Sequence, residues 1–176
     1  MREATAAEQS VGTIGRWAAA LFALMLAACA TPASLAPGTP IADARAALGR
    51  PTAEVPLPDG GSRLQYSGQP FVQSVWNADF DSQGRLRRVQ QMMTDDAFSH
   101  VRAGKDTQAD ILRDFGPPAD SFHYRLKNET AYMYRYYTHG NFHAAMFVYF
   151  DPAGVVKRTE TGLDPWMLRD GGGRDK

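Results

Sequence analysis

Residues 76–88 of the chain read WNADFDSQGRLRR, and residues 146–158, at an offset of 70, read MFVYFDPAGVVKR. Both stretches place apolar residues around an Asp-x-x-Gly sequence, which is typical of two antiparallel strands joined by a type I turn. Asp81 and Asp151 are therefore interpreted as turn residues and not as a catalytic carboxylate pair. The recurrence of this hairpin at a fixed offset indicates an internal duplication.

A second pair of stretches has nearly the same offset. Residues 38–51 read GTPIADARAALGRP, and residues 104–118 read GKDTQADILRDFGPP. The Gly-x-Pro sequence at 49–51 recurs at 116–118, where glycine followed by proline predicts the end of a helix.

The two predicted helices differ in how they begin. Thr39 is expected to cap the first helix, whereas Thr107 and Asp110 form a pair that resembles a capping box. Each helix has an apolar face with which it can pack on a sheet. The expected apolar residues are Ile41, Ala44 and Leu48 in the first copy, and Ile111, Leu112 and Phe115 in the second.

The remaining pattern predicts an α+β fold made of two tandem units, each a short helix or helix pair packed on an antiparallel meander. Strands are expected over 64–66, 71–80 and 86–91, then over 122–126, 130–137, 142–150 and 155–161, with a short helix over 94–101. The first unit is expected to cover residues 38–93, the second residues 94–162, and a C-terminal segment with a disordered tail residues 163–176. One such unit buries little apolar surface alone, so the two are expected to abut.

The N-terminal stretch predicts where the protein resides. Residues 17–26 are uncharged and apolar, and the sequence Leu26-Ala27-Ala28-Cys29 supplies the one cysteine of the chain. This pattern is typical of a secretory signal and resembles the lipobox of bacterial lipoproteins. We therefore expect residues 1–28 to be removed, Cys29 to carry fatty acyl chains such as palmitate, and residues 29–37 to form a flexible tether. Alternatively, Cys29 is merely a small residue near the end of a signal peptide or membrane anchor.

Charge and residue types argue against several classes of function. Once Arg2, Arg16, Glu3 and Glu8 are removed with the signal, 17 basic and 17 acidic residues remain, so nucleic acid is not expected as a partner. His139 and His143 have a spacing that suits a metal site on a helix, but Gly-Asn turns the chain between them. Neither a metal nor a cofactor is therefore expected. With no catalytic constellation in the sequence, the protein is not expected to be an enzyme.

The motifs together resemble a known family. The order of a glycine and a threonine before a helix, Gly-x-Pro at its end, strands and Asp-x-x-Gly resembles the SmpA/OmlA (BamE-like) outer-membrane lipoprotein domain, and its tandem form is similar to the β-lactamase-inhibitor-protein fold. The resemblance covers about residues 38–160. It implies a non-enzymatic envelope protein, although a typical BamE-like protein has one copy and the inhibitor proteins are disulfide-bonded.

A candidate partner surface lies on the second sheet. Phe142, Met146, Val148 and Phe150 are expected to face the helices, which leaves His143, Ala145, Phe147 and Tyr149 on the other face. Their first-unit counterparts are Gln73, Val75, Asn77 and Asp79, so this face changes from polar to aromatic between the units. The adjacent strand contributes Met133, Arg135 and Tyr137, or alternatively Tyr132, Tyr134 and Tyr136. The predicted partner-binding residues are Met133, Arg135, Tyr137, His143, Phe147 and Tyr149. The alternative is that they pack under the C-terminal segment 163–168.

The sequence thus leads to an expected function. We expect a protein-binding module anchored by lipid to the periplasmic face of the bacterial outer membrane, with an envelope protein as its partner and a role in outer-membrane assembly or envelope integrity. Two alternatives remain open from the sequence: an inhibitor or regulator of a periplasmic enzyme, and a binder of cell-wall glycan.

Overall fold

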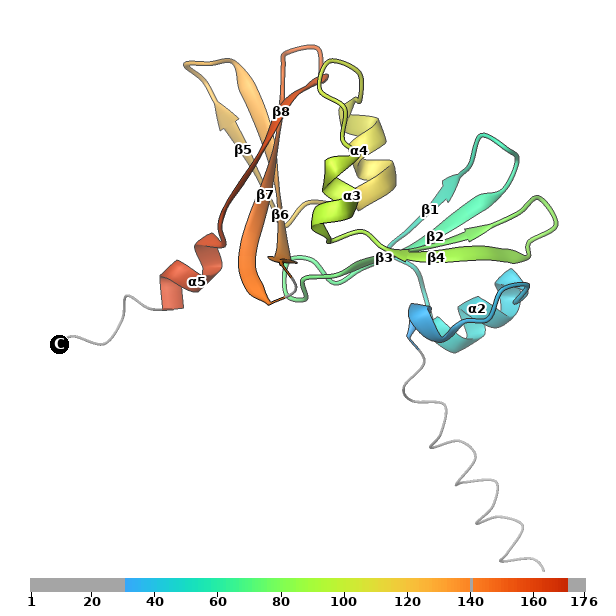
Figure 1. The fold of residues 1–176 in the computed structure, drawn as a ribbon. Helices are drawn as coiled ribbons and strands as arrows, with labels where there is room; N and C mark the ends of the chain where they lie inside the picture. Colours follow the sequence, from blue (N-terminus) through green and yellow to red (C-terminus); the bar gives the residue numbers. More distant parts are fainter. Residues whose placement is uncertain (1–30, 140, 171–176) are drawn as a thin grey trace, which may run out of the picture.

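The computed structural model describes residues 31–139 and 141–170, which form two units, each built on a four-stranded antiparallel sheet (Figure 1). The first sheet has the order β1-β2-β3-β4, with β1 Ala53–Pro56, β2 Ser62–Ser67, β3 Val75–Phe80 and β4 Leu86–Gln91. The second has the order β5-β6-β7-β8, with β5 Asp120–Tyr124, β6 Glu129–Thr138, β7 Phe142–Phe150 and β8 Val156–Leu163. The helices are η2 Pro32–Ser34, α2 Ile41–Leu48, α3 Asp95–Ser99, α4 Gln108–Phe115 and α5 Pro165–Asp170. The expected α+β fold with two units is confirmed.

The predicted Asp-x-x-Gly turns are present in both units. Asp81 Oδ1 accepts the N–H groups of Gln83 and Arg85, and Asp151 Oδ1 accepts those of Ala153 and Val155, at 2.8–3.0 Å. The glycines that end these turns have φ angles of 71° and 79°, in the left-handed region that favours glycine. The two aspartates are therefore turn residues, as the sequence predicted.

The helices and sheets alternate in layers. Helix α2 covers one face of the first sheet, where Ala44 packs with Leu64, Ala78, Phe80 and Leu86. Helices α3 and α4 lie between the two sheets (Figure 1). Toward the second sheet they bury a larger aromatic core, which includes Phe98, Ile111, Phe115, Tyr134, Tyr136, Met146, Val148 and Phe150. The order of layers is α2, first sheet, α3 with α4, second sheet.

Toward the first sheet, α4 makes polar contacts through the end of the helix. The last carbonyls of a helix have no partner within it. Here Arg113 O accepts hydrogen bonds from Arg63 Nη1 (3.2 Å) and Gln65 Nε2 (3.3 Å), and Asp114 O accepts one from Asn77 Nδ2 (2.8 Å). The first unit thus caps the central helix of the second unit, which ties the two units together.

Helix boundaries differ from the sequence expectation in the first unit. The Thr39 hydroxyl donates to Ala36 O at 2.6 Å instead of capping α2, whose N-cap residue is Pro40. The capping box of Thr107 and Asp110 is present as predicted. On α4, Ile111 and Phe115 are buried one turn apart, which leaves Leu112 on the outer side with 38% of its surface exposed.

Three other segments differ from the prediction. Strand β1 was not predicted, since it is only four residues long and ends in Pro56. Residues 71–74 form a loop before β3 instead of the start of the strand. Residues 31–37 contain η2, and Leu35 packs against the first core, so this part of the expected flexible tether belongs to the folded unit. Strands β4 and β7 have the predicted bounds.

Candidate functional site

The register of β6 and β7 decides which side chains share the outer face of the second sheet. Met133 pairs with Phe147, Arg135 with Ala145, and Tyr137 with His143. Tyr134 and Tyr136, which alternate with these residues, lie in the core beneath α3 and α4. The first of the two alternatives from the sequence is therefore correct, and the six predicted partner-binding residues all lie on one face.

Two of these six residues are not available to a partner, which corrects the prediction. Met133 is 1% exposed and Arg135 is 7% exposed. Arg135 Nε donates to Asp164 Oδ2 at 2.8 Å, its Nη1 donates to Pro70 O at 2.6 Å, and its guanidinium lies 4.5 Å from the centre of the Trp166 ring. Arg135 therefore holds the β2–β3 loop and the start of α5 on the sheet. At this end of the face, packing under the C-terminal segment is the correct alternative.

Tyr137 and His143 lie beyond Arg135, at the end of the sheet next to the β6–β7 turn. Their ring centres are 4.7 Å apart, and 44% of Tyr137 is exposed. His143 is half-buried, and its Nδ1 has no hydrogen-bond partner among the described residues. Arg135 and its partners separate this pair from Phe147 and Tyr149.

At the other end of the sheet, four rings form a continuous surface that we call the aromatic face: Phe122 and Tyr124 from β5, and Phe147 and Tyr149 from β7. The ring centres are 6.4 Å apart for Phe122 and Phe147, 6.4 Å for Phe147 and Tyr149, and 6.0 Å for Tyr124 and Tyr149. Tyr124 is 40% exposed, and the other three rings are half-buried. Ala131, which is small and fully buried, lies between the two pairs in the register and lets the rings approach one another.

Charged groups fix the orientation of Tyr149. The Arg158 guanidinium lies 3.7 Å from the ring centre and donates hydrogen bonds to Glu129 (2.9 Å) and Glu160 (2.7 Å). Burial, followed by the nearby Glu160 carboxylate, raises the pKa of Tyr149 to about 12. The phenol is therefore neutral at physiological pH, and one side of its ring is covered by a cation.

Sequence reasoning missed Phe122, Tyr124 and Arg158. Two aromatic residues at i and i+2 in a strand share a face, and β5 pairs with β6 so that Phe122 lies beside Ala131. The spacing of Phe122 and Tyr124 was a usable signal. The sequence alone could not show that these two rings reach across β6 to residues of β7, because that follows from the order of the strands in the sheet.

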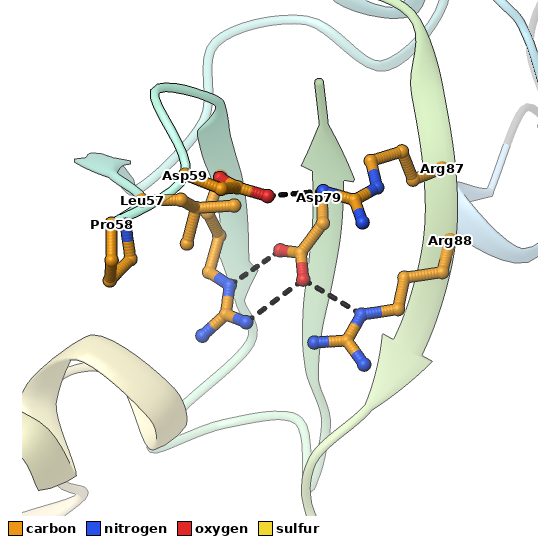
Figure 2. A pocket seen from close by; sticks show the side chains of 7 residues that line it. Leu57, Pro58, Asp59, Asp79, Arg87 and Arg88 are labelled. Atoms are coloured by element: carbon orange, nitrogen blue, oxygen red, sulfur yellow. Dashed lines mark hydrogen bonds and ion pairs between the residues drawn. The ribbon is translucent and has the colours of Figure 1, made fainter. Parts of the chain in front are cut away.

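A cavity of about 410 Å³ lies on the first sheet, at the end occupied by the β1–β2 loop. It is lined by Leu57, Pro58, Asp59, Arg63, Asp79, Arg87 and Arg88 (Figure 2). Asp79 lies at its base, where its carboxylate accepts from Arg63 Nε (2.6 Å), Arg63 Nη2 (3.0 Å) and Arg88 Nε (2.9 Å). Nothing in the sequence pattern marked this site, because its residues come from three strands and a loop.

Other predicted features lie outside these two sites. Cys29, the predicted lipidation site, lies outside the described residues. Across residues 31–139 and 141–170, no group of three His, Cys, Asp or Glu side chains is placed to hold a metal ion. In the same part of the chain, no helix is long and apolar enough to cross a membrane.

Comparison with known proteins gives one distant structural likeness. Neither a protein-family model nor a curated protein matches the sequence. Among solved structures, a DUF4309 family protein (YjgB) from Bacillus subtilis matches with a TM-score of 0.30 at 12% identity, covering 72% of this chain and 79% of that chain.

Proposed function

We propose that this protein is a non-catalytic binding module, anchored through lipid on Cys29 to the periplasmic face of the bacterial outer membrane, that presents the aromatic face to a protein partner. The observation that carries the proposal is the contrast between equivalent surfaces of the two units. Asn77 and Asp79 of the first sheet lie beneath α4, whereas their counterparts Phe147 and Tyr149 lie on the outer face, away from α3 and α4.

The first unit supplies a template for the partner. Its sheet face receives the C-terminal end of a helix, whose carbonyls accept hydrogen bonds from polar side chains. The aromatic face offers apolar rings in the same place, and aromatic residues supply much of the binding energy at protein interfaces. Because rings cannot donate to the free carbonyls of a helix end, the fitting partner is a protein that presents an apolar surface to the sheet.

We also infer that both units are BamE-like and that the partner belongs to the outer-membrane assembly machinery or contributes to envelope integrity. The glycine and threonine before each helix, the Gly-x-Pro sequence at each helix end and the Asp-x-x-Gly turns support this inference, together with the signal-like N-terminus. Replacing Cys29 with Ser tests the anchor, because it removes the thiol that would be acylated. Labelled palmitate that still enters the Cys29→Ser protein would contradict the assignment.

The same surface could serve an inhibitor of a periplasmic enzyme or a glycan binder, and these rivals predict different partners. Sugar binding is less favoured, since Arg158 already covers one side of the Tyr149 ring at 3.7 Å.

The experiment that discriminates between these functions places a photoreactive side chain at position 124 in living cells. A matched control places it at position 71, where Phe71 is 81% exposed on the β2–β3 loop and outside the aromatic face.

A cross-link to an assembly subunit from position 124 alone supports the proposal. A cross-link to a single hydrolase supports the inhibitor, and retention on peptidoglycan without any protein cross-link supports the glycan binder. Equal cross-linking from positions 124 and 71 would contradict a specific aromatic interface.

A further inference from the structure

The cavity on the first sheet contains two arginines that the fold holds in place without using all of their hydrogen-bond donors. Arg87 and Arg88 are adjacent on β4, and their side chains extend toward Asp59 and Asp79 (Figure 2). About half of each side chain is exposed, 55% for Arg87 and 57% for Arg88. The cavity therefore presents guanidinium groups to solvent.

The inner charges of the cavity are fully engaged. Arg63 binds Asp79 through Nε and Nη2, and its Nη1 binds Asp114 at 2.9 Å and Arg113 O at 3.2 Å. Burial alone would raise the pKa of Asp79, but hydrogen bonds and charge from Arg63 and Arg88 hold it below its ordinary value. Asp79 is thus an anion that fixes both arginines and is not itself free to receive a ligand.

The outer arginines retain donors. Arg88 uses its Nε on Asp79, and Arg87 uses its Nη1 on Asp59, whose other oxygen accepts the Gly61 N–H. Among the described residues, both terminal nitrogens of Arg88, and Nε and Nη2 of Arg87, have no hydrogen-bond partner. One nitrogen of each guanidinium is hydrogen-bonded to an aspartate, so the remaining nitrogens are available to donate to a ligand in the cavity.

We propose that this cavity is a binding site for a single carboxylate group carried on an apolar body. Planar guanidinium groups bind carboxylates through paired, charge-assisted hydrogen bonds. Three arginines and two aspartates line the cavity, and Asp114 binds Arg63 from outside it, so these arginines and the aspartates that contact them balance in charge. One carboxylate brings a single negative charge to the free donors of Arg87 and Arg88, whereas a phosphate monoester would bring about −1.5 to −2 charges beside Asp59 and Asp79. Leu57 and Pro58 form the apolar wall that receives the body of the ligand.

The second unit does not repeat this arrangement. Lys157 and Arg158 occupy the positions equivalent to Arg87 and Arg88. Both of them bind Glu129, at 2.6 and 2.9 Å, and Arg158 also binds Glu160. Lys157 and Arg158 thus share one buried glutamate, whereas Arg87 and Arg88 each contact a separate aspartate and line a cavity.

To test this proposal, N-acetylleucine is titrated into the full-length protein in detergent. The side-chain NMR signals of the arginines report binding. N-acetylleucinamide, which has the same body and no carboxylate, is the matched control. We expect saturable shifts of the Arg87 and Arg88 signals with the acid alone.

A second experiment uses a short peptide that ends in leucine and compares its form with a free C-terminus to its form with an amidated C-terminus. Tighter binding of the free peptide than of N-acetylleucine identifies a chain terminus as the natural group, and the reverse identifies a small acid.

Variants separate binding from folding. Arg87→Gln leaves the Asp79 network intact and should weaken the acid about tenfold, the effect of losing one charged contact. Arg50→Gln removes an exposed arginine outside the cavity and should leave the affinity unchanged. Arg88→Lys should keep the fold but weaken binding, because lysine loses the planar fork. Equal binding of acid and amide, or equal affinity of the Arg87→Gln and Arg50→Gln variants, would overturn the proposal.

Discussion

The inner face of the first sheet and the aromatic face of the second sheet occupy equivalent positions, yet the polar one is the more deeply buried. In the first sheet Arg63 pairs with Asp79 and Gln65 with Asn77 in the register. In the second, Ala131 pairs with Tyr149 and Met133 with Phe147. Asn77 and Asp79 are 0% and 3% exposed, whereas Phe147 and Tyr149 are half-buried.

The difference follows from what covers each face. The first sheet receives the end of α4, where unpaired carbonyls need donors, so Arg63, Gln65 and Asn77 are useful there. A buried polar side chain is tolerated when its hydrogen bonds are made, and among these three side chains only Gln65 Oε1 is buried without a partner in the described part of the chain. The aromatic face has no such carbonyls above it within the described part of the chain. The polarity of each sheet face therefore depends on the chemical groups of the element that covers it, and not on how deeply the face is buried.

The largest effect is expected from breaking the charge pair beneath α4. Asp79→Ala leaves the guanidinium of Arg63, which is 6% exposed, without its main partner, and should lower the free energy of unfolding by about 3 to 5 kcal/mol. The equivalent substitution, Tyr149→Ala, removes a half-buried ring and should cost about 1 to 2 kcal/mol, less than a fully buried aromatic residue. Urea denaturation of both variants measures the contrast.

If Tyr149→Ala proved as destabilising as Asp79→Ala, the aromatic face would be a structural core and not an open surface. The single substitution Asp81→Ala, in the exposed turn after β3, serves as a control for general effects at this end of the sheet.

A second pair of variants separates stability from binding. Asn77→Ala leaves Asp114 O without its donor and should cost about 1 to 3 kcal/mol of stability while leaving partner recovery unchanged. The double variant Phe147→Ala with Tyr149→Ala should fold and lose the partner. Quantitative recovery of the cross-linked partner, together with the melting temperature, checks both variants. A double variant that kept its partner would remove the aromatic face from the proposed function.

Sequence reasoning anticipated the elements of this contrast but not its geometry. The repeat, the Asp81 and Asp151 turns and the bounds of β4 and β7 follow from local periodicity and turn chemistry, which act within a few residues. The change from Asn77 and Asp79 to Phe147 and Tyr149 was also visible. The contact between the end of α4 and the first sheet was not visible in the sequence, because Arg63 and Asp114 are brought together only by the packing of one unit on the other. Arg135 was misjudged for the same reason, since Asp164 and Pro70 reach it from distant segments.

A smaller effect is expected from a hydrogen bond that both units make. The Tyr134 hydroxyl donates to Gly116 O at 2.8 Å in the core, and the equivalent Tyr66 hydroxyl donates to Gly49 O at 3.4 Å near the surface. Tyr134→Phe leaves a buried carbonyl without a donor and should cost about 1 to 1.5 kcal/mol, whereas Tyr66→Phe should cost well under 1 kcal/mol because water can replace the donor. Thermal unfolding of the two variants compares them. Equal losses would mean that the helix ends of the two units are equally exposed to water.

The smallest effect concerns the start of α4, the helix that covers the polar face. Hydrogen bonds from the Thr107 backbone N–H and hydroxyl, with help from Arg113, lower the pKa of Asp110 to about 2. Its ordinary value is 3.8, so the folded protein favours the ionised form, and this contribution is present above about pH 4 and lost as the pH falls through 2. Asp110→Asn should therefore be less stable than the parent by about 0.5 kcal/mol near neutral pH, a modest value because the side chain is partly exposed. The deficit should shrink as the pH approaches 2. Helix α2 has no side-chain cap, so Asp43→Asn, at the equivalent position, is the control for the loss of an acidic side chain in the first turn of a helix. A deficit for Asp110→Asn that is constant between pH 7 and 2 would show that α4 is held by the first sheet alone.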